Sequence, residues 1–393
     1  MAKIVVLGGA GAMGQITVRD LAVSASHHDV VVADLDEARA RDLVKELGKK
    51  HLSATSVDLK DERSLAGVLQ GAGCIINSAP YYFNVQVMEA SLKAGCHYID
   101  LGGLYHVTFK QLELHDQFKK KDLLAVLGTG ASPGTTNIMV AAAAREFDTI
   151  SDIAIICAGV DNVVSDHPFE PPYMLDTMLD EYTMPAPVFE NGAVVMKPPF
   201  SEEELIDFPE PIGRQSAMPT IHSEVATLPV SYREKGVSYV AFKLALPSDM
   251  HARLKFLVEL GFGGKDKVKT GEGEFTPRKI LAEMIARIPS EKRAADDVEI
   301  LRVDVSGTRG KSETFVRMEA MARANPDMKV GGGDLNTGIP PSIIAQMIVD
   351  NKIKDRGVLA PELCVDPEQF FAELGKRGVV VRKTAQNQLA PTC

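Results

Sequence analysis

Three glycines and one acid near the start of the chain have the types and spacing to bind a dinucleotide. Gly9, Gly11 and Gly14 follow the apolar run Ile4–Leu7 in a GxGxxG pattern. Such glycines allow a tight strand-to-helix turn and a close approach of backbone to a pyrophosphate, and the helix N-terminus supplies N–H donors. Asp34 ends a second apolar run about 20 residues later, where a carboxylate can accept both ribose hydroxyls. We therefore predict a dinucleotide-binding βαβ unit; the alternative is a glycine turn that binds nothing.

The acid also predicts which dinucleotide is bound. A 2′-phosphate beside Asp34 would meet like charge, and residues 35–37 offer no cation to receive it. Arg39 and Arg41 are the nearby residues that could compensate. NAD is therefore expected as the cofactor, with NADP disfavoured.

Polar residues just past later strands extend this predicted site, because a doubly wound sheet binds ligands at the carboxyl ends of its strands. Asp58 could reach the adenine, and Asn77 with its two successors would lie near the nicotinamide. For each of them the alternative is a helix cap or a turn. The predicted cofactor contacts are Gly9, Gly11, Ala12, Met13, Gly14, Asp34, Leu35, Asp58, Asn77, Ser78 and Ala79.

Short apolar runs alternate with helix-like stretches up to residue 127, which is typical of a parallel sheet covered by helices. The predicted strands are Lys3–Leu7, Val30–Asp34, Ser53–Asp58, Cys74–Asn77, His97–Asp100 and Leu123–Leu127. The predicted helices between them are Met13–Ser24, Glu37–Leu47, Glu62–Leu69, Val85–Ala94 and Thr108–Lys119. The fold class is therefore α/β, with an N-terminal Rossmann domain built on a doubly wound parallel sheet.

After a helix at Thr135–Phe147, longer runs predict a second, α+β domain with an extended, mostly antiparallel sheet. The segment Pro168–Pro211 holds nine prolines and is expected to resist regular structure, as a lid, a wrap or an interface. Pro277 and the apolar positions after it predict a helix at Thr276–Ile288. The strands of this domain are predicted at Ile153–Ala158, Ser238–Leu246, Val298–Val305 and Thr314–Arg323.

The end of the chain is expected to return to the first domain. A helix at Ile343–Val349 carries an apolar face that the first sheet could cover, and a second helix is predicted at Pro367–Leu374. We therefore place the dinucleotide-binding domain at 1–134, a substrate-binding domain at 135–336 and the returning segment at 337–393.

Composition and charge exclude several classes of protein. The chain has 393 residues, 45% of them hydrophobic, a net charge of −10 and five scattered cysteines without CxxC spacing. It is long enough for about two domains, and neither a disulfide framework nor a metal site is indicated. The acidic balance argues against a nucleic-acid partner, and the longest apolar run, Ile138–Ala144, is too short for a membrane span. We expect a cytoplasmic location.

These motifs make the chain resemble the saccharopine dehydrogenase family, and most closely its lysine 6-dehydrogenase branch. The matching stretches cover nearly the whole chain. They are GGAGAMG at 8–14, VADLD at 32–36, the pair at 57–58, YYFN at 81–84, HYIDLGG at 97–103 and SPGTTN at 132–137. Looser matches follow at EYTMPA (181–186), NG (191–192), IHSEVATLP (221–229) and TGIPPSIIAQMI (337–348).

The resemblance implies a homodimer whose second domain carries the dimer sheet, and oxidoreduction at a carbon that bears nitrogen in a small amino acid or amine. In the lysine 6-dehydrogenase branch, NAD accepts a hydride from the carbon that bears the side-chain amine. In saccharopine reductases, NADPH reduces an imine between an aldehyde and glutamate. Asp34 favours the first reaction; the alternatives are an imine reductase that forms saccharopine or carboxynorspermidine, and a non-catalytic NAD-binding sensor.

Amine oxidation requires a base, because a primary ammonium has a pKa far above neutral and must lose a proton before hydride leaves. The candidates are Asp100, His106, His222 and Glu224. Histidine titrates closest to neutral pH, so His106 and His222 are favoured as proton carriers and the carboxylates as holders of the ammonium.

Candidates for binding the substrate lie in the same segments. Tyr81, like its neighbour Tyr82, could flank the nicotinamide or simply pack, and Gly102 and Gly103 follow the fifth predicted strand. A substrate carboxylate would need a cation, for which Arg214 is chosen and two other arginines remain open: Arg233 and Arg278. The histidines outside these motifs are expected at the surface: His27, His28, His51 and His167.

Overall fold

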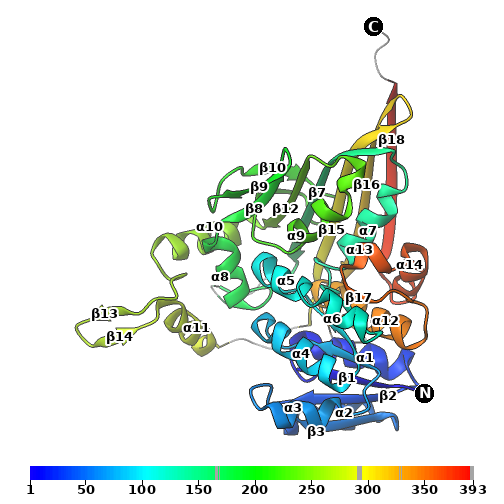
Figure 1. Ribbon diagram of the computed structural model, residues 1–393. Helices are drawn as coiled ribbons and strands as arrows, with labels where there is room; N and C mark the ends of the chain where they lie inside the picture. The colour runs from blue at the N-terminus through cyan, green and yellow to red at the C-terminus, as the bar shows by residue number, and fades with distance from the viewer. Residues whose placement is uncertain (164–166, 168, 290–293, 327, 329, 390–393) are drawn as a thin grey trace.

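The chain forms two β-sheets joined and covered by helices. The computed structural model describes residues 1–163, 167, 169–289, 294–326, 328 and 330–389 (Figure 1). Separate apolar cores lie on the two faces of the first sheet: Ile4 and Val6 face one core, and Val5 and Leu7 face the other. This burial of alternate residues on both sides explains the continuous apolar runs in the sequence.

The first sheet is parallel throughout, with strand order β17-β6-β5-β4-β1-β2-β3. Six of its strands are β1 (Lys3–Leu7), β2 (Asp29–Asp34), β3 (Leu52–Ser56), β4 (Cys74–Asn77), β5 (His97–Asp100) and β6 (Leu124–Val126). They confirm the predicted strands, and their order is that of a Rossmann fold with its topological switch between β1 and β4. The seventh strand, β17 (Gly357–Leu359), pairs with β6 and is too short to give a pattern in the sequence.

The helices of this half lie close to their predicted positions, with one exception. They are α1 (Ala12–Ser24), α2 (Glu37–Leu47), α3 (Glu62–Leu69), α4 (Asn84–Ala94) and α7 (Thr135–Ala144). The helix predicted at Thr108–Lys119 is instead two helices, α5 (Leu104–Leu112) and α6 (His115–Lys120). Between them the Leu114 N–H bonds the Gln111 carbonyl at 3.1 Å, a three-residue step that ends the α-helical ladder.

The second sheet is mixed, with order β10-β11-β12-β7-β15-β16-β18 and with β8 and β9 attached at β12. Its strands are β7 (Thr149–Asp161), β8 (Ala186–Glu190), β9 (Ala193–Lys197), β10 (Glu204–Asp207), β11 (Arg214–Pro219), β12 (Tyr239–Leu246), β15 (Asp297–Arg309), β16 (Ser312–Arg323) and β18 (Val380–Leu389). The predicted antiparallel pairing is correct for β7, β15 and β16 and for β12 against β11 and β8, but β12 runs parallel to β7. The long connection between these two strands sets the direction, and local polarity does not encode its path.

The proline-rich segment Pro168–Pro211 contains regular structure, so the expectation that it lacks any was wrong. It includes α8 (Leu175–Thr183) and the strands β8, β9 and β10. Most of its prolines fall between these elements, and Pro187 lies inside β8, a short strand at the side of the sheet where proline is tolerated. Further along are α9 (Glu224–Ser231), α10 (Ser248–Glu259), the hairpin of β13 (Val268–Thr270) and β14 (Gly273–Phe275), and α11 (Pro277–Arg287).

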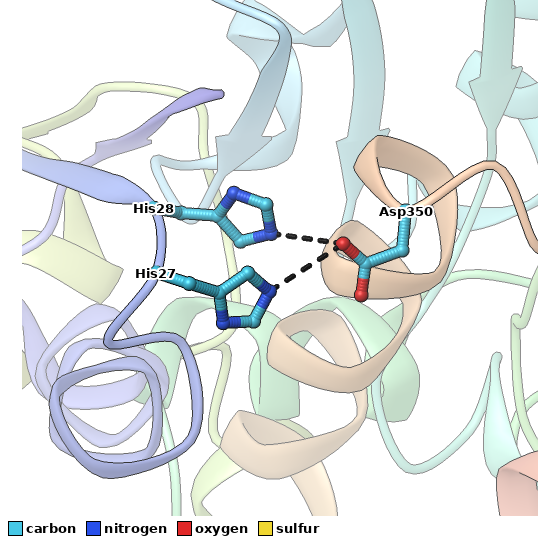
Figure 2. A group of neighbouring side chains, drawn as sticks. All are labelled: His27, His28 and Asp350. Carbon is cyan, nitrogen blue, oxygen red and sulfur yellow. Dashed lines mark hydrogen bonds and ion pairs between the residues drawn. The ribbon is translucent and has the colours of Figure 1, made fainter. Parts of the chain in front are cut away.

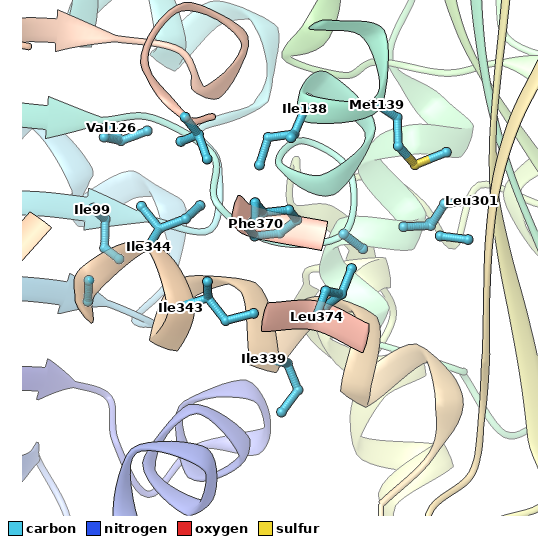
Figure 3. Close-up of a cluster of buried hydrophobic side chains, with 14 of the residues drawn as sticks. Ile99, Val126, Ile138, Met139, Leu301, Ile339, Ile343, Ile344, Phe370 and Leu374 are labelled. Carbon is cyan, nitrogen blue, oxygen red and sulfur yellow. The ribbon is translucent and has the colours of Figure 1, made fainter. Parts of the chain in front are cut away.

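The segment 337–393 divides between the two sheets. Helix α12 (Gly332–Val349) packs on α1, β4 and β5, whereas β18 pairs with β16 in the second sheet. Figure 3 shows Ile343 and Ile344 of α12 near Ile99 of the first sheet, with Phe370 of α14 (Pro367–Gly375) beside them. The short helix α13 (Pro361–Cys364) lies between β17 and α14. In the described part of the chain, no helix combines the length and apolarity that a membrane span needs.

Helix α12 is longer than its predicted range because two prolines conceal its first half. It begins at Gly332 rather than Ile343, and Pro340 and Pro341 lie inside it. Proline inside a helix is usually a break signal, which is why the sequence pattern predicted a later start.

Candidate active site

The turn between β1 and α1 has the form that a pyrophosphate site requires. Gly8 adopts φ +67°, so the left-handed position of the turn precedes the GxGxxG motif and was not assigned from the sequence. A Cβ on Gly9 would lie 2.8 Å from the Val32 side chain, and one on Gly14 would collide with the Gly8 carbonyl. A Cβ on Gly11 would meet one backbone oxygen at 3.1 Å. The turn therefore fits a dinucleotide, and its glycines, with Ala12 and Met13, would hold the phosphates.

Asp34 and Arg39 lie together at the ribose end of this turn. Asp34 accepts the Ala10 N–H at 3.0 Å, while the Arg39 guanidinium donates to the Ala10 carbonyl at 2.7 Å. Arg41 instead pairs with Glu37 on the surface of α2. The acid is thus placed for ribose hydroxyls, with Leu35 exposed beside it, and a cation lies within the same loop region.

The predicted residues after β3 and β4 differ in what they offer a ligand. Asp58 is exposed and closes a turn by accepting the Lys60 N–H at 2.9 Å. Asn77 is buried and donates to Asn84 at 2.9 Å, so it organises the loop. The Ser78 hydroxyl is buried and has no hydrogen-bond partner in the described part of the chain, and Ser78 precedes Ala79 beside the glycine turn. An orphaned hydroxyl here fits a site that a dinucleotide completes.

Asp100, predicted as a catalytic acid, is instead held inside the domain with no exposed surface. Its carboxylate accepts from Gly102 N and Gly128 N at 2.9 and 2.7 Å, and from Tyr98 and Gln111 at 2.9 and 2.6 Å. Burial is the largest influence on its pKa, which is raised despite these four donors. The geometry makes Asp100 the connection between two loops and gives it no access to a substrate.

Gly102 and Gly103, which were predicted to bind the substrate, are packed too closely against neighbouring residues to carry a side chain. Gly102 has φ +123°, and a Cβ there would lie 2.9 Å from Pro133. A Cβ on Gly103 would collide with the Gln111 side chain. The Ser223 Oγ lies 3.7 Å from where a Cβ on Gly102 would be, and this buried hydroxyl has no partner among the described residues.

His222 and Glu224 form a buried acid–base pair. The His222 Nδ1 bonds Glu224 Oε2, and the other carboxylate oxygen bonds the hydroxyls of Ser132 and Thr136. The imidazole also stacks on Phe242, with ring centroids 3.7 Å apart. Because Nδ1 faces the carboxylate, Nε2 is the nitrogen left to exchange a proton.

The position and protonation of this pair suit proton transfer. Ser132 lies in the loop after β6 and Thr136 in the first turn of α7, so the pair is tied to the carboxyl edge of the first sheet, where Rossmann folds bind ligands. Burial lowers the pKa of His222, but the charge and hydrogen bond of Glu224 outweigh it and the pKa is raised. Burial raises the pKa of Glu224, and His222 more than reverses this. The histidine therefore holds a proton more readily than a free imidazole.

Glu181 of α8 is a buried acid beside this pair that the sequence analysis did not assign. It is 6% exposed and accepts a hydrogen bond from the Tyr173 hydroxyl. Burial, as the largest cause, raises the pKa of Glu181 to about 7, while the charge of His222 opposes the shift. Glu181 is the first residue of the EYTMPA stretch that matches the family, but nothing in the sequence placed Glu181 near His222.

A second cluster joins the two halves of the chain around Asp180. Its carboxylate contacts Arg278 at 2.7 Å, Lys265 at 2.8 Å and, from the first domain, the Tyr81 hydroxyl at 3.3 Å. His106 is exposed with its ring 6.1 Å from that of Tyr81, so it belongs to this edge and not to the His222 pair. Tyr82 is also exposed.

The arginines considered for a substrate carboxylate are not free at the His222 pair. Arg214 is exposed at the start of β11 and lies 3.6 Å from Asp207. Arg233 is exposed on the turn after α9, and Arg278 is buried against Asp180 and the Gly263 carbonyl. The structure therefore does not bring Arg214 to the site that the sequence analysis assigned to it.

His27, His28 and Asp350 place three potential metal ligands together (Figure 2). His28 is 4% exposed, so the expectation of a surface residue was wrong. Its Nδ1 accepts the Ala2 N–H at 3.2 Å, so the ring proton lies on Nε2, which faces Asp350 at 3.1 Å. With its Nε2 lone pair unavailable, His28 acts as a hydrogen-bonded link between the start of β2 and the end of α12.

A Rossmann sheet with a pyrophosphate turn, and a buried histidine–carboxylate pair at its strand ends, define a nicotinamide-dependent oxidoreductase. Residues 4–126 match the model of the saccharopine dehydrogenase NADP binding domain, and residues 130–379 match the saccharopine dehydrogenase C-terminal domain. The chain belongs to the saccharopine dehydrogenase family, which confirms the resemblance seen in its motifs.

Several known proteins are similar to this chain over nearly its whole length. A carboxyaminopropylagmatine dehydrogenase of Synechocystis is 24% identical over 391 residues, covering 96% of each chain. A carboxynorspermidine synthase of Vibrio alginolyticus is 22% identical over 404 residues, covering 94% of each. The apo saccharopine dehydrogenase (L-Glu forming) of Saccharomyces cerevisiae has a TM-score of 0.77 at 17% identity, covering 98% of this chain and all of that one. The yeast protein and this chain therefore share the same fold.

Proposed function

We propose that this protein reduces an imine, formed between an amine and an aldehyde, to a secondary amine. The observation that carries the proposal is the buried His222–Glu224 pair at the strand ends, whose histidine has a raised pKa. An imine must gain a proton on nitrogen as hydride adds to carbon, so a protonated imidazole suits this direction. The names of the two relatives, a carboxyaminopropylagmatine dehydrogenase and a carboxynorspermidine synthase, agree with such a reaction.

Each part of the site has a role in this reaction. The glycine turn and Asp34 bind and orient the nicotinamide cofactor, which supplies a hydride when bound in its reduced form. His222 Nε2 donates its proton to the imine nitrogen, and Glu224 stabilises the imidazolium before transfer. Glu181 lies near enough to His222 for their charges to interact, and its pKa of about 7 suits it to exchange protons near neutral pH. The C=N bond becomes C–N, and one proton and one hydride are consumed.

The oxidation of lysine with NAD, implied by the resemblance to lysine 6-dehydrogenase, stays a prediction that a direct assay can test. Absorbance of the reduced nicotinamide would be followed with NADH or NADPH and agmatine or a diamine together with an amino-acid aldehyde. Lysine with NAD or NADP forms the second arm. Consumption of the reduced cofactor only when amine and aldehyde are both present supports the imine reductase, whereas formation of reduced cofactor from lysine alone contradicts it.

The choice between NADH and NADPH depends on Asp34 and Arg39. We expect NADH to bind more tightly, because Asp34 repels a 2′-phosphate. Asp34→Ala is expected to narrow the difference, and Arg39→Ala to weaken NADPH about tenfold with little effect on NADH. Fluorescence titration of both reduced cofactors measures this, with Arg41→Ala as the matched control on α2. Equal titration curves for NADH and NADPH in the wild type would reject the preference.

A further inference from the structure

The segment GTGASPGTTN (128–137), which follows β6, presents two hydroxyl groups to the buried acid–base pair. Ser132 Oγ donates to Glu224 Oε1. Thr136 Oγ1 lies 3.3 Å from the same carboxylate oxygen and 3.0 Å from Ser132 Oγ. Because Oε2 of this carboxylate bonds His222, both of its oxygens are held and its plane cannot rotate freely.

The start of this segment is fixed to the end of the first sheet. The Thr129 N–H and the Thr129 hydroxyl each donate to the Asp100 carbonyl at 2.7 Å. The Gly128 N–H donates to the Asp100 carboxylate, also at 2.7 Å. Asp100 ends β5, which lies between β4 and β6 in the sheet. Ser132, three residues after Thr129, is therefore connected to the strand ends at which a Rossmann fold binds its cofactor.

The turn from Ser132 to Thr136 is closed on itself. Gly134 has φ +135°, and a Cβ there would lie 2.2 Å from the Gly130 carbonyl oxygen, so glycine is required. The Thr136 N–H donates to the Ala131 carbonyl at 3.1 Å. A backbone that is held on both sides of Ser132 gives its hydroxyl a defined position.

His222 depends on the Glu224 carboxylate for its orientation. The imidazole stacks on Phe242 with ring centroids 3.7 Å apart, and a stacked ring could be turned by half a revolution without losing this contact. The bond between Nδ1 and Glu224 distinguishes the two orientations. Burial raises the pKa of Glu224, but the charge and hydrogen bond of His222, and then the bond from Ser132, outweigh it. The carboxylate therefore accepts these bonds as an anion.

We propose that Ser132 is a positioning residue for the proton donor of the proposed reaction. Its hydroxyl holds the Glu224 carboxylate, which selects the orientation and the tautomer of His222. The inference rests on the proposed imine reduction, because it explains how His222 Nε2 is directed at the imine nitrogen. Misplacing a reacting group by about 1 Å can lower a rate by about 10², so a hydroxyl that acts only through Glu224 still affects turnover.

Nuclear magnetic resonance of the full chain, with ¹⁵N-labelled histidine, tests this role without turnover. At a pH above the pKa of His222, the neutral ring should carry its proton on Nδ1 alone, because Nδ1 donates to Glu224. Ser132→Ala should give a mixture with the Nε2–H tautomer. The signal that His222→Gln lacks identifies the ring. Ser91→Ala, which removes a buried hydroxyl that donates to the Cys96 carbonyl at 2.7 Å, is the matched control and should keep one tautomer.

The rate of imine reduction gives a second measurement. Ser132→Ala should lower kcat about tenfold, the loss expected for one hydrogen bond to a charged group, and leave the KM of the reduced cofactor unchanged. Ser132→Thr retains a hydroxyl and should recover most of the rate. Thr136→Val should cost less than Ser132→Ala, because the Thr136 hydroxyl is 3.3 Å from the carboxylate.

Three results would overturn the positioning role. These are a single Nδ1–H tautomer in Ser132→Ala, a loss of rate that Ser91→Ala shares, and a larger loss in Thr136→Val than in Ser132→Ala. If Ser132→Ala fails to fold, Ser132→Cys decides the question by the same two measurements, because a thiol has a similar shape and is a weak donor.

The positioning role and the proposed reaction fail in different ways. A tautomer mixture that appears in Ser132→Ala, without consumption of reduced cofactor by the wild type in any amine and aldehyde mixture, would retain the positioning of His222 and reject imine reduction. Imine reduction by the wild type, with kcat and tautomer unchanged in Ser132→Ala, would retain the reaction and reject the role of Ser132.

Discussion

Replacement of His222 by glutamine is expected to lower kcat for imine reduction by about 10² to 10⁴, the range in which a positioned acid contributes to catalysis. Glutamine retains a polar group against Phe242 but cannot donate a proton from an imidazolium. Cofactor affinity should be unchanged, because His222 contacts Glu224 and no residue of the glycine turn. Stopped-flow measurement of the hydride step, together with a cofactor titration, separates the two quantities.

The substitution Glu224→Gln tests the role of His222 as proton donor through the pH dependence of kcat. The charge of Glu224 raises the pKa of His222, so its removal lowers that pKa. Imine reduction needs the protonated imidazole and is lost as pH rises through the pKa of His222. The basic limb of the kcat profile should therefore move to lower pH in Glu224→Gln. A rate reduced equally at all pH values would indicate a structural role only.

Two histidine variants complete the test. His27→Gln changes an exposed ring at the far end of α12 and is the matched control, with unchanged rate. His106→Gln should cost less than tenfold, because that ring lies at the exposed edge near Tyr81. If the His106 substitution lowers kcat more than the His222 substitution does, His106 is the proton donor instead.

The dinucleotide half could be predicted from the sequence because its signals are local. Gly9, Gly14 and Asp34 belong to one βαβ unit and lie within about 25 residues, and steric limits on glycine fix the backbone of its first turn. The same limits identify Gly8 only once φ is known, since nothing in its sequence context distinguishes it from Gly9. The strands could be predicted from short continuous apolar runs, because a parallel sheet is buried on both faces.

The acid–base site was predicted only in part because its members come from distant segments. His222 and Glu224 were found because they lie two residues apart in the sequence, but Glu181 approaches them only through the folding of α8 onto the second sheet. Asp100 was predicted as a catalytic acid because a strand-end acid has the same sequence pattern whether it faces a cleft or the interior.

Asp100→Ala is expected to destabilise the protein by roughly 3–5 kcal/mol, since it leaves four buried donors without an acceptor. Those donors hold the loops after β5 and β6 together, and Gly102 and Gly128 are among them. Asp100→Asn should cost only about 1–2 kcal/mol. Its oxygen keeps the two glycine N–H groups, and once the Gln111 amide flips, its amide nitrogen can donate to Gln111 Oε1, which has no partner among the described residues. The midpoint of urea denaturation, followed by circular dichroism, measures both changes.

Asp100→Asn also distinguishes between two roles of Asp100, a structural one and the catalytic one that its position at the end of a strand suggested. An exposed acid on α2 that is assigned to no site, Asp42→Asn, serves as the control and should change neither stability nor rate by a measurable amount. A folded Asp100→Asn protein that retains more than a tenth of the wild-type rate supports the loop-holding role, because an amide cannot transfer the proton that a carboxyl group would. If that variant denatures at the wild-type midpoint yet loses turnover by 10² or more, the carboxylate takes part in the reaction, and the loops must then open enough to expose it.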